Sequence, residues 1–207
     1  MGAHKRTQGG DETKVSELFS GKTVEGTKRL DHGHVYILPL ESNSRRGRID
    51  RVLIYSQLRS FTSDELDAVR GVRELYQSSG RPEIRCVLTW QGTLAGSVAR
   101  RRTHAVISTT PFVSPRHWRK GRDFEDFLKK EIRRECGNHG IESEPSEIER
   151  GSLQGNLFDC IEYRRNRKED PVRPGYAFRL RFPEPVLAPF AIGYGAHFGL
   201  GQFHPAE

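Results

Sequence analysis

The sequence changes from polar to strand-forming at His32-Gly33-His34-Val35-Tyr36-Ile37-Leu38-Pro39, where β-branched and aromatic residues follow one another. A turn-forming stretch at residues 42–47 comes next, and residues 49–56 again have the composition of a strand. Because two such strands joined by a short polar turn usually pair, we expect a β-hairpin here. Residues 1–30 are rich in Gly, Lys and Thr without apolar periodicity, which indicates a flexible arm or linker.

Beyond the hairpin, the pattern alternates between strands and two helices. The first helix is predicted after the capping sequence Thr62-Ser63-Asp64-Glu65, and the second begins at Asp123 with an apolar face of Phe124, Phe127, Leu128 and Ile132. Further strands are expected at residues 84–90, 104–113, 148–153, 158–164 and 176–182. This alternation favours an α+β fold with antiparallel sheets over a doubly wound parallel sheet.

The composition indicates a basic protein without a disulfide framework. The 207 residues include 34 Lys and Arg against 27 Asp and Glu, a net charge of +7, which favours a polyanionic partner. Three widely separated cysteines fit neither a disulfide framework nor a paired zinc motif. No apolar run is long enough to span a bilayer and no signal peptide is evident, so we expect a cytoplasmic protein that does not bind membranes.

The basic residues gather in four clusters, at 45–48, 100–102, 116–122 and 164–168. Trp118, Tyr163 and Tyr176 lie within or near them and offer rings on which bases could stack. Cations interleaved with aromatic rings suit single-stranded or hairpin RNA better than base reading in a DNA groove. A solvated surface is the alternative for any single cluster.

Two histidines, His32 and His34, lie two residues apart on a predicted strand, so their side chains share one face. A histidine near neutral pH can take the proton from a ribose 2′-hydroxyl, while a second cation stabilises the charge that develops on the phosphate. The same pair would also fit a structural role or a metal-dependent hydrolase.

Four glycines alternate with aromatic and apolar residues in Gly193-Tyr194-Gly195-Ala196-His197-Phe198-Gly199-Leu200-Gly201. Such a segment can leave backbone N–H groups open to phosphates, and glycine permits close approach of a ligand. The Lys-Ser/Thr of a nucleotide-binding loop is absent, which argues against NTP hydrolysis. A glycine-rich strand that closes an aromatic core is the structural alternative.

These motifs together resemble the fused subunit of type I-G (formerly I-U) CRISPR effector complexes, a member of the RAMP superfamily. The resemblance rests on residues 20–22, 32–39, 47–50, 110–113, 116–117 and 191–201, and so covers most of the chain from residue 20 onward. The chain is similar to the C-terminal, repeat-processing endoribonuclease part of that subunit. It departs from the expected pattern at Arg51, where a histidine would follow Ile49-Asp50, and in the short spacer of the glycine-rich motif.

The resemblance implies tandem ferredoxin-like (RRM-like) units, which we place at residues 31–113 and 114–207, with a glycine-rich C-terminal loop that contacts RNA. It implies cleavage of the CRISPR repeat without a metal or other cofactor, by attack of the 2′-hydroxyl to leave a 2′,3′-cyclic phosphate. The implied partners are repeat RNA or crRNA and the other subunits of a type I complex. The alternative function is a non-catalytic RNA-binding scaffold.

The candidate catalytic residues are His32 or His34 as the general base and His197 as the second imidazole, which would act on the 5′-oxygen leaving group. Arginines, a lysine, aromatic residues and backbone glycines make up the candidate RNA-binding set. This set comprises Arg48, Arg116, His117, Trp118, Arg119, Lys120, Arg122, Arg164, Arg165, Gly193, Tyr194, Gly195, Gly199 and Gly201.

Overall fold

The computed structural model describes residues 16–23, 26–27, 33–41, 49–57, 59–75, 84–151, 162–163 and 173–206. The chain divides into two compact units. The first consists of residues 1–35 and 56–97, and the second of residues 36–55 and 98–207. Within the described ranges, no helix combines the length and the apolar composition needed to cross a membrane.

The second unit is built around a long strand, β9 (Arg173–Ala188, 16 residues). On one side β9 pairs with β5 (Arg101–Ser108), which in turn pairs with β11 (Gln202–Pro205). On the other side β9 pairs with β7 (Glu147–Gly151). All three pairings are antiparallel, which gives the strand order β11-β5-β9-β7.

Three short strands extend this sheet. β6 (Phe112–Val113) and β8 (Glu162–Tyr163) pair with the N-terminal part of β9, and β10 (Phe190–Ala191) pairs with β11. The fold is therefore α+β with antiparallel sheets, as the alternation of elements predicts.

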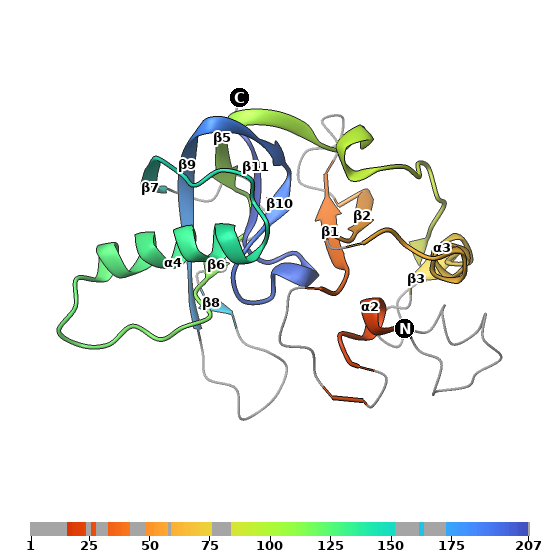
Figure 1. Ribbon diagram of the computed structural model, residues 1–207, viewed down its shortest axis with the longest axis horizontal. Coiled ribbons are helices and arrows are strands. Elements are labelled where there is room, and N and C mark those ends of the chain that lie inside the picture. Colours follow the sequence, from red (N-terminus) through yellow and green to blue (C-terminus); the bar gives the residue numbers. More distant parts are fainter. Residues whose placement is uncertain are drawn as a thin grey trace. The chain divides into compact units, whose positions relative to one another are not determined.

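Helix α4 (Phe124–Asn138) covers one face of the sheet, where it crosses β9 (Figure 1). It begins where expected, because the Asp123 side chain accepts a hydrogen bond of 2.6 Å from the backbone N–H of Asp126. Leu128 and Ile132 are fully buried in the core that also contains Phe178. The apolar spacing of the sequence thus marks the face on which α4 packs.

The expected hairpin is present in the second unit. It pairs β1 (Tyr36–Leu40) with β2 (Arg51–Tyr55) in antiparallel register, with Tyr36 opposite Tyr55. The two tyrosine rings stack at a centroid distance of 4.8 Å and an angle of 11°. Both rings are buried, so the hairpin contributes an aromatic face to this unit.

The described part of the first unit contains two short helices, a two-stranded sheet and a 3₁₀ turn. These elements are α2 (Glu17–Ser20), α3 (Ser63–Arg70), β3 (Glu74–Leu75), β4 (Ile84–Arg85) and η2 (Leu94–Gly96).

The capping sequence before α3 acts as predicted, because Thr62 and Glu65 bond each other's backbone N–H groups. The strand expected at 84–90 is shorter, since only Ile84 and Arg85 pair with β3. Val87, just beyond it, is 78% exposed.

The two compact units differ from the units expected at 31–113 and 114–207. Strand β5 falls in the first expected unit and β9 in the second, yet the two pair along most of β5. Long-range pairing of this kind leaves no local mark in the sequence. The arm expected at 1–30 also contains packed residues, because α2 buries Leu18, whose carbonyl accepts the Val35 N–H at 2.9 Å.

Candidate functional site

The glycine-rich segment, residues 193–201, forms a tight turn in the second unit between β10 and β11. Its centre is the 3₁₀ turn η3 (Ala196–Phe198). Gly193 has φ +91°, and a Cβ there would lie 2.7 Å from the Phe112 ring and 2.8 Å from the Val113 carbonyl oxygen. A Cβ on Gly201 would lie 2.0 Å from the Ile192 carbonyl oxygen. Glycine is required at both positions because the backbone packs too closely for a side chain.

Most amide groups of this segment are engaged within the protein. The Tyr194 N–H donates to the Val113 carbonyl at 2.9 Å, and the Gly201 N–H donates to the Pro111 carbonyl at 2.9 Å. Backbone carbonyls also accept the N–H groups of Ala196, Phe198, Gly199 and Leu200. The expected array of amides open to phosphates is therefore largely closed, and contacts with a ligand fall to the side chains.

The segment brings His197 to Tyr36 of β1. The two rings lie 4.1 Å apart between centroids, and His197 is 7% exposed. Its ring also lies 5.9 Å from the ring of His139. His139 is fully buried, and its Nδ1 lies 2.5 Å from the Tyr36 hydroxyl oxygen. Two imidazoles and a phenol therefore meet beneath the glycine-rich turn.

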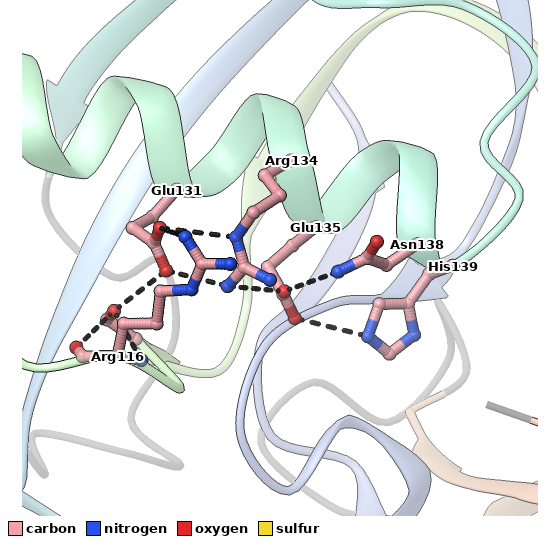
Figure 2. Close-up of polar contacts among 7 residues, drawn as sticks. Arg116, Glu131, Arg134, Glu135, Asn138 and His139 are labelled. Carbon is pink, nitrogen blue, oxygen red and sulfur yellow. Dashed lines mark hydrogen bonds and ion pairs between the residues drawn. The ribbon is translucent and has the colours of Figure 1, made fainter. Parts of the chain in front are cut away.

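This cluster continues into the carboxylates of α4 (Figure 2). Nε2 of His139 lies 3.3 Å from a Glu135 carboxylate oxygen, while Arg134 and Asn138 approach the other oxygen at 2.9 and 3.1 Å. Burial alone would raise the pKa of Glu135, but the contact with His139 and the charge of Arg134 hold that pKa below its ordinary value. Glu135 is therefore ionised at neutral pH.

Tyr36 stays neutral. Burial, with Tyr55 and Glu135 nearby, raises the pKa of its hydroxyl far above the usual range. The phenol is then the donor to Nδ1 of His139, and Nε2 of His139 lies 3.3 Å from a Glu135 carboxylate oxygen. The buried relay is this chain of contacts from Tyr36 through His139 to Glu135. Its second link is a close approach of His139 to Glu135 without hydrogen-bond geometry.

The same helix face links to the basic loop, residues 114–122. Glu131 is buried and bonds Arg134 at 2.7 and 3.2 Å, and one of its oxygens lies 3.8 Å from the Arg116 guanidinium (Figure 2). The Ser114 hydroxyl donates to the Arg116 carbonyl at 2.7 Å, and its oxygen lies 3.4 Å from Glu131. One polar network therefore runs along α4 from the basic loop to His139.

The basic loop presents its side chains to solvent. Arg116, His117, Trp118, Arg119, Lys120 and Arg122 are all exposed. The indole N–H of Trp118 donates to the Arg122 carbonyl at 2.9 Å, and the ring meets Phe124 edge-on at 5.7 Å. Trp118 is thus held in place while 42% of its surface stays exposed.

The predicted site residues divide among three places. The glycines, Tyr194, His197 and the six residues from Arg116 to Arg122 lie in the second unit. His34 lies in the first unit, where its half-buried ring sits 3.6 Å from the position of a Cβ on Gly21. His32, Arg48, Arg164 and Arg165 fall outside the described residues.

Sequence reasoning missed three members of the cluster, Tyr36, Glu135 and His139, and the exposed ring of Phe198. Glu135 and His139 are four residues apart on a predicted helix, a spacing that places two side chains on one face. That spacing was the available signal. No local sequence pattern indicates that Tyr36 contacts them, because Tyr36 lies on a strand 103 residues before His139.

Comparison with known proteins finds no matching family model, no matching curated protein and no matching solved structure. Within the described residues, no group of three or more His, Cys, Asp or Glu side chains is placed to hold a metal ion.

Proposed function

We propose that this chain is a CRISPR repeat endoribonuclease that cleaves precursor crRNA without a metal and stays bound to the guide RNA. The observation that carries the proposal is the union, in one unit, of an exposed cationic and aromatic loop with the glycine-rich segment that holds His197. The two are joined directly, because Val113, whose carbonyl bonds Tyr194, immediately precedes the basic loop.

The joined surface has the chemistry of an interface for single-stranded RNA. The basic loop offers Arg119, Lys120 and Arg122, for which the described acidic side chains form no ion pair. Trp118 lies in the same loop as these cations and is 42% exposed, and Phe198 of the glycine-rich segment is 69% exposed. Cations track the RNA backbone and exposed rings stack on bases, so the combination favours unpaired RNA over a duplex.

The proposed reaction is a transesterification within the RNA. A histidine takes the proton of the 2′-hydroxyl, the 2′-oxygen bonds to phosphorus, and the bond from phosphorus to the 5′-oxygen breaks as that oxygen gains a proton. The products are a 2′,3′-cyclic phosphate and a 5′-hydroxyl. His32 or His34 is the proposed base and His197 the proposed acid, while Arg116 and its neighbours stabilise the negative charge.

The finer fold and the setting are part of the same proposal. The four main strands follow one another in the chain as β5, β7, β9 and β11, with α4 between β5 and β7. Across the sheet their order is β11-β5-β9-β7, so the fourth strand lies beside the first, and the third lies between the first and the second. This order is that of a ferredoxin-like unit, although β10 and η3 stand in place of its second helix between β9 and β11. We extend it to the tandem, RAMP-type arrangement of type I-G subunits. The partners would be crRNA and the other subunits of a type I complex, in the cytoplasm.

A second function, a non-catalytic RNA-binding scaffold, is favoured by one observation. His197 is only 7% exposed, and both Tyr36 and His139 are fully buried. An imidazole must come within hydrogen-bond distance of the reacting oxygen to act as a general acid. If the glycine-rich turn keeps this packing on RNA, the chain holds the guide RNA without cutting it.

The interface is tested by measuring the RNA affinity of wild type and of Lys120→Ala at several salt concentrations. The matched control is Lys129→Ala, which removes the same charge from an exposed position of α4. The control should bind as wild type does. Lys120→Ala should weaken binding and reduce the salt slope by about 0.7 to 0.9, because the protein then neutralises one phosphate fewer. Equal slopes in all three proteins would remove the basic loop from the interface.

A further inference from the structure

Arg100 is a buried cation at the start of β5, and the proposed reaction does not use it. Its side chain is 9% exposed, although it precedes two exposed arginines, Arg101 and Arg102. Nη2 donates to the Leu187 carbonyl at 2.8 Å. The guanidinium carbon lies 5.1 Å from the centre of the Tyr55 ring, which makes a cation–π contact.

These contacts leave much of the guanidinium unsatisfied. Nε and Nη1, which together carry three N–H groups, are buried and have no hydrogen-bond partner among the described residues. The hydroxyl of Tyr55 is also buried and also lacks a described partner. An unpaired buried donor destabilises a protein, and a charged one does so more strongly, so four such donor groups at one place need an explanation.

The acidic residues that the structure describes in this unit do not supply the missing acceptor. Glu142 lies near enough to affect Arg100, but its carboxylate is paired with Arg102 at 2.9 Å. Burial lowers the pKa of Arg100, while Tyr55 and Glu142 raise it. An arginine remains charged under such conditions, so the unpaired groups belong to a cation.

We infer that Arg100 and Tyr55 form a binding site for a phosphate group. The planar guanidinium supplies several N–H donors to phosphate oxygens, and the phenol adds a neutral O–H donor. Burial raises the pKa of Tyr55 well above its ordinary value, so the hydroxyl keeps its proton. The unpaired donors themselves have almost no exposed surface, so a phosphate reaches them only when the covering side chains move. The exposed Arg101 and Arg102 would attract an anion to this place.

The molecule that carries the phosphate, an RNA, is inferred from the proposed function, whereas the binding site is inferred from Arg100 and Tyr55 alone. A terminal phosphate monoester and an internal phosphodiester of RNA share the chemistry that this site recognises. Only an end group or a sharply bent backbone can place a phosphate against a side chain that is 9% exposed. We therefore favour a terminal phosphate, which carries more charge and projects from the end of the strand.

The test compares thermal unfolding in sodium phosphate with unfolding in sodium chloride of equal ionic strength. The proteins are wild type, Arg100→Met, Tyr55→Phe and the matched control Arg179→Met, which removes an exposed arginine from β9. A bound ligand raises the melting temperature by mass action, so phosphate should stabilise wild type and the control equally. Arg100→Met should lose this increment, and Tyr55→Phe, which removes only the hydroxyl, should weaken phosphate binding about tenfold.

A purely structural Arg100 gives a different result. Arg100→Met would then lower the melting temperature in both salts and keep the same phosphate increment as wild type, or wild type would show no increment at all. Either result overturns the inference. If Arg100→Met does not fold, Tyr55→Phe gives the same comparison.

Binding measurements with three forms of one RNA then identify which phosphate occupies the site. One repeat RNA is prepared with a 5′-phosphate, with a 3′-phosphate and with hydroxyls at both ends. We expect one phosphorylated form to bind wild type about tenfold more tightly than the hydroxyl form, and Arg100→Met to abolish that difference. An Arg100-dependent decrease in affinity shared by all three RNAs assigns the site to an internal phosphodiester.

Failure of the site and failure of the proposed function are distinguishable. RNA binding by wild type without a phosphate increment removes only the site. A phosphate increment without RNA binding removes only the RNA function.

Discussion

Replacing His139 with alanine is the sharpest test of the buried relay. The substitution removes the acceptor of the Tyr36 hydroxyl and the imidazole that faces Glu135. Tyr36 and Glu135 are 0% and 2% exposed, so water does not replace the missing imidazole without rearrangement. Each buried group left unsatisfied costs about 1–3 kcal/mol, although Arg134 and Asn138 still bond Glu135.

With the cavity left by the ring, we expect His139→Ala to lower the free energy of unfolding by about 3–5 kcal/mol. Urea denaturation followed by circular dichroism measures this change. The matched control is His104→Ala, which removes an exposed imidazole from β5 and should change stability by less than about 1 kcal/mol. A double-mutant cycle with Tyr36→Phe should give a coupling of about 1–2 kcal/mol.

The pH dependence of the free energy of unfolding is a second test of His139→Ala. The pKa of Glu135 lies below its unfolded value near 4.5, so its stabilising effect is present above that pH and is lost as the pH falls. Without His139, one group that lowers this pKa is gone, and the acid loss of stability should become smaller. A destabilisation below about 1 kcal/mol, a coupling near zero and an unchanged acid limb would refute the relay.

Three other variants test the core, the first unit and the RNA interface. Ile132→Ala, in the fully buried face of α4, should destabilise the protein by about 2–5 kcal/mol in urea denaturation, whereas exposed Lys129→Ala should not. Burial opposes the ionisation of Glu65, but bonds from Arg59, Ser16 and Thr62 hold its pKa at about 2, so its stabilising effect is present above pH 4.5 and lost toward pH 2. Glu65→Gln should therefore lower stability at pH 7 and flatten the acid limb of an unfolding series; an unchanged limb contradicts this. Phe198→Ala should weaken RNA binding by about 1–3 kcal/mol without changing the salt slope, since the ring contributes stacking and no charge, and equal affinity in a titration would exclude that stacking.

Local features of the sequence predict the elements that local physics controls. Asp123 and the apolar spacing after it predict α4, and Thr62 with Glu65 predicts the start of α3. The hairpin follows from two strand-forming runs around a polar turn. In each case the decisive interaction joins residues close in the chain, or the pattern repeats at the period of the element.

Long-range pairing and close packing account for what the sequence did not reveal. Strand β5 pairs with β9 across the boundary expected between the two units, at residues 113 and 114, and no local sequence pattern predicts this pairing. The sequence of the glycine-rich segment predicts an open loop because glycines allow many backbone conformations. Its closure depends on carbonyls of Pro111 and Val113, about 80 residues earlier in the chain. The same reasoning applies to Tyr36 and His139.

The most direct test of the proposed function is incubation of the chain with an end-labelled CRISPR repeat RNA in excess EDTA, followed by analysis of the product ends. Wild type is compared with His32→Ala, His34→Ala and His197→Ala, and with His104→Ala as the control imidazole. We predict cleavage in EDTA that leaves a 2′,3′-cyclic phosphate and a 5′-hydroxyl, that is abolished in His197→Ala and that persists in His104→Ala. Tight binding without cleavage by wild type would contradict the catalytic claim and assign the chain to the scaffold function.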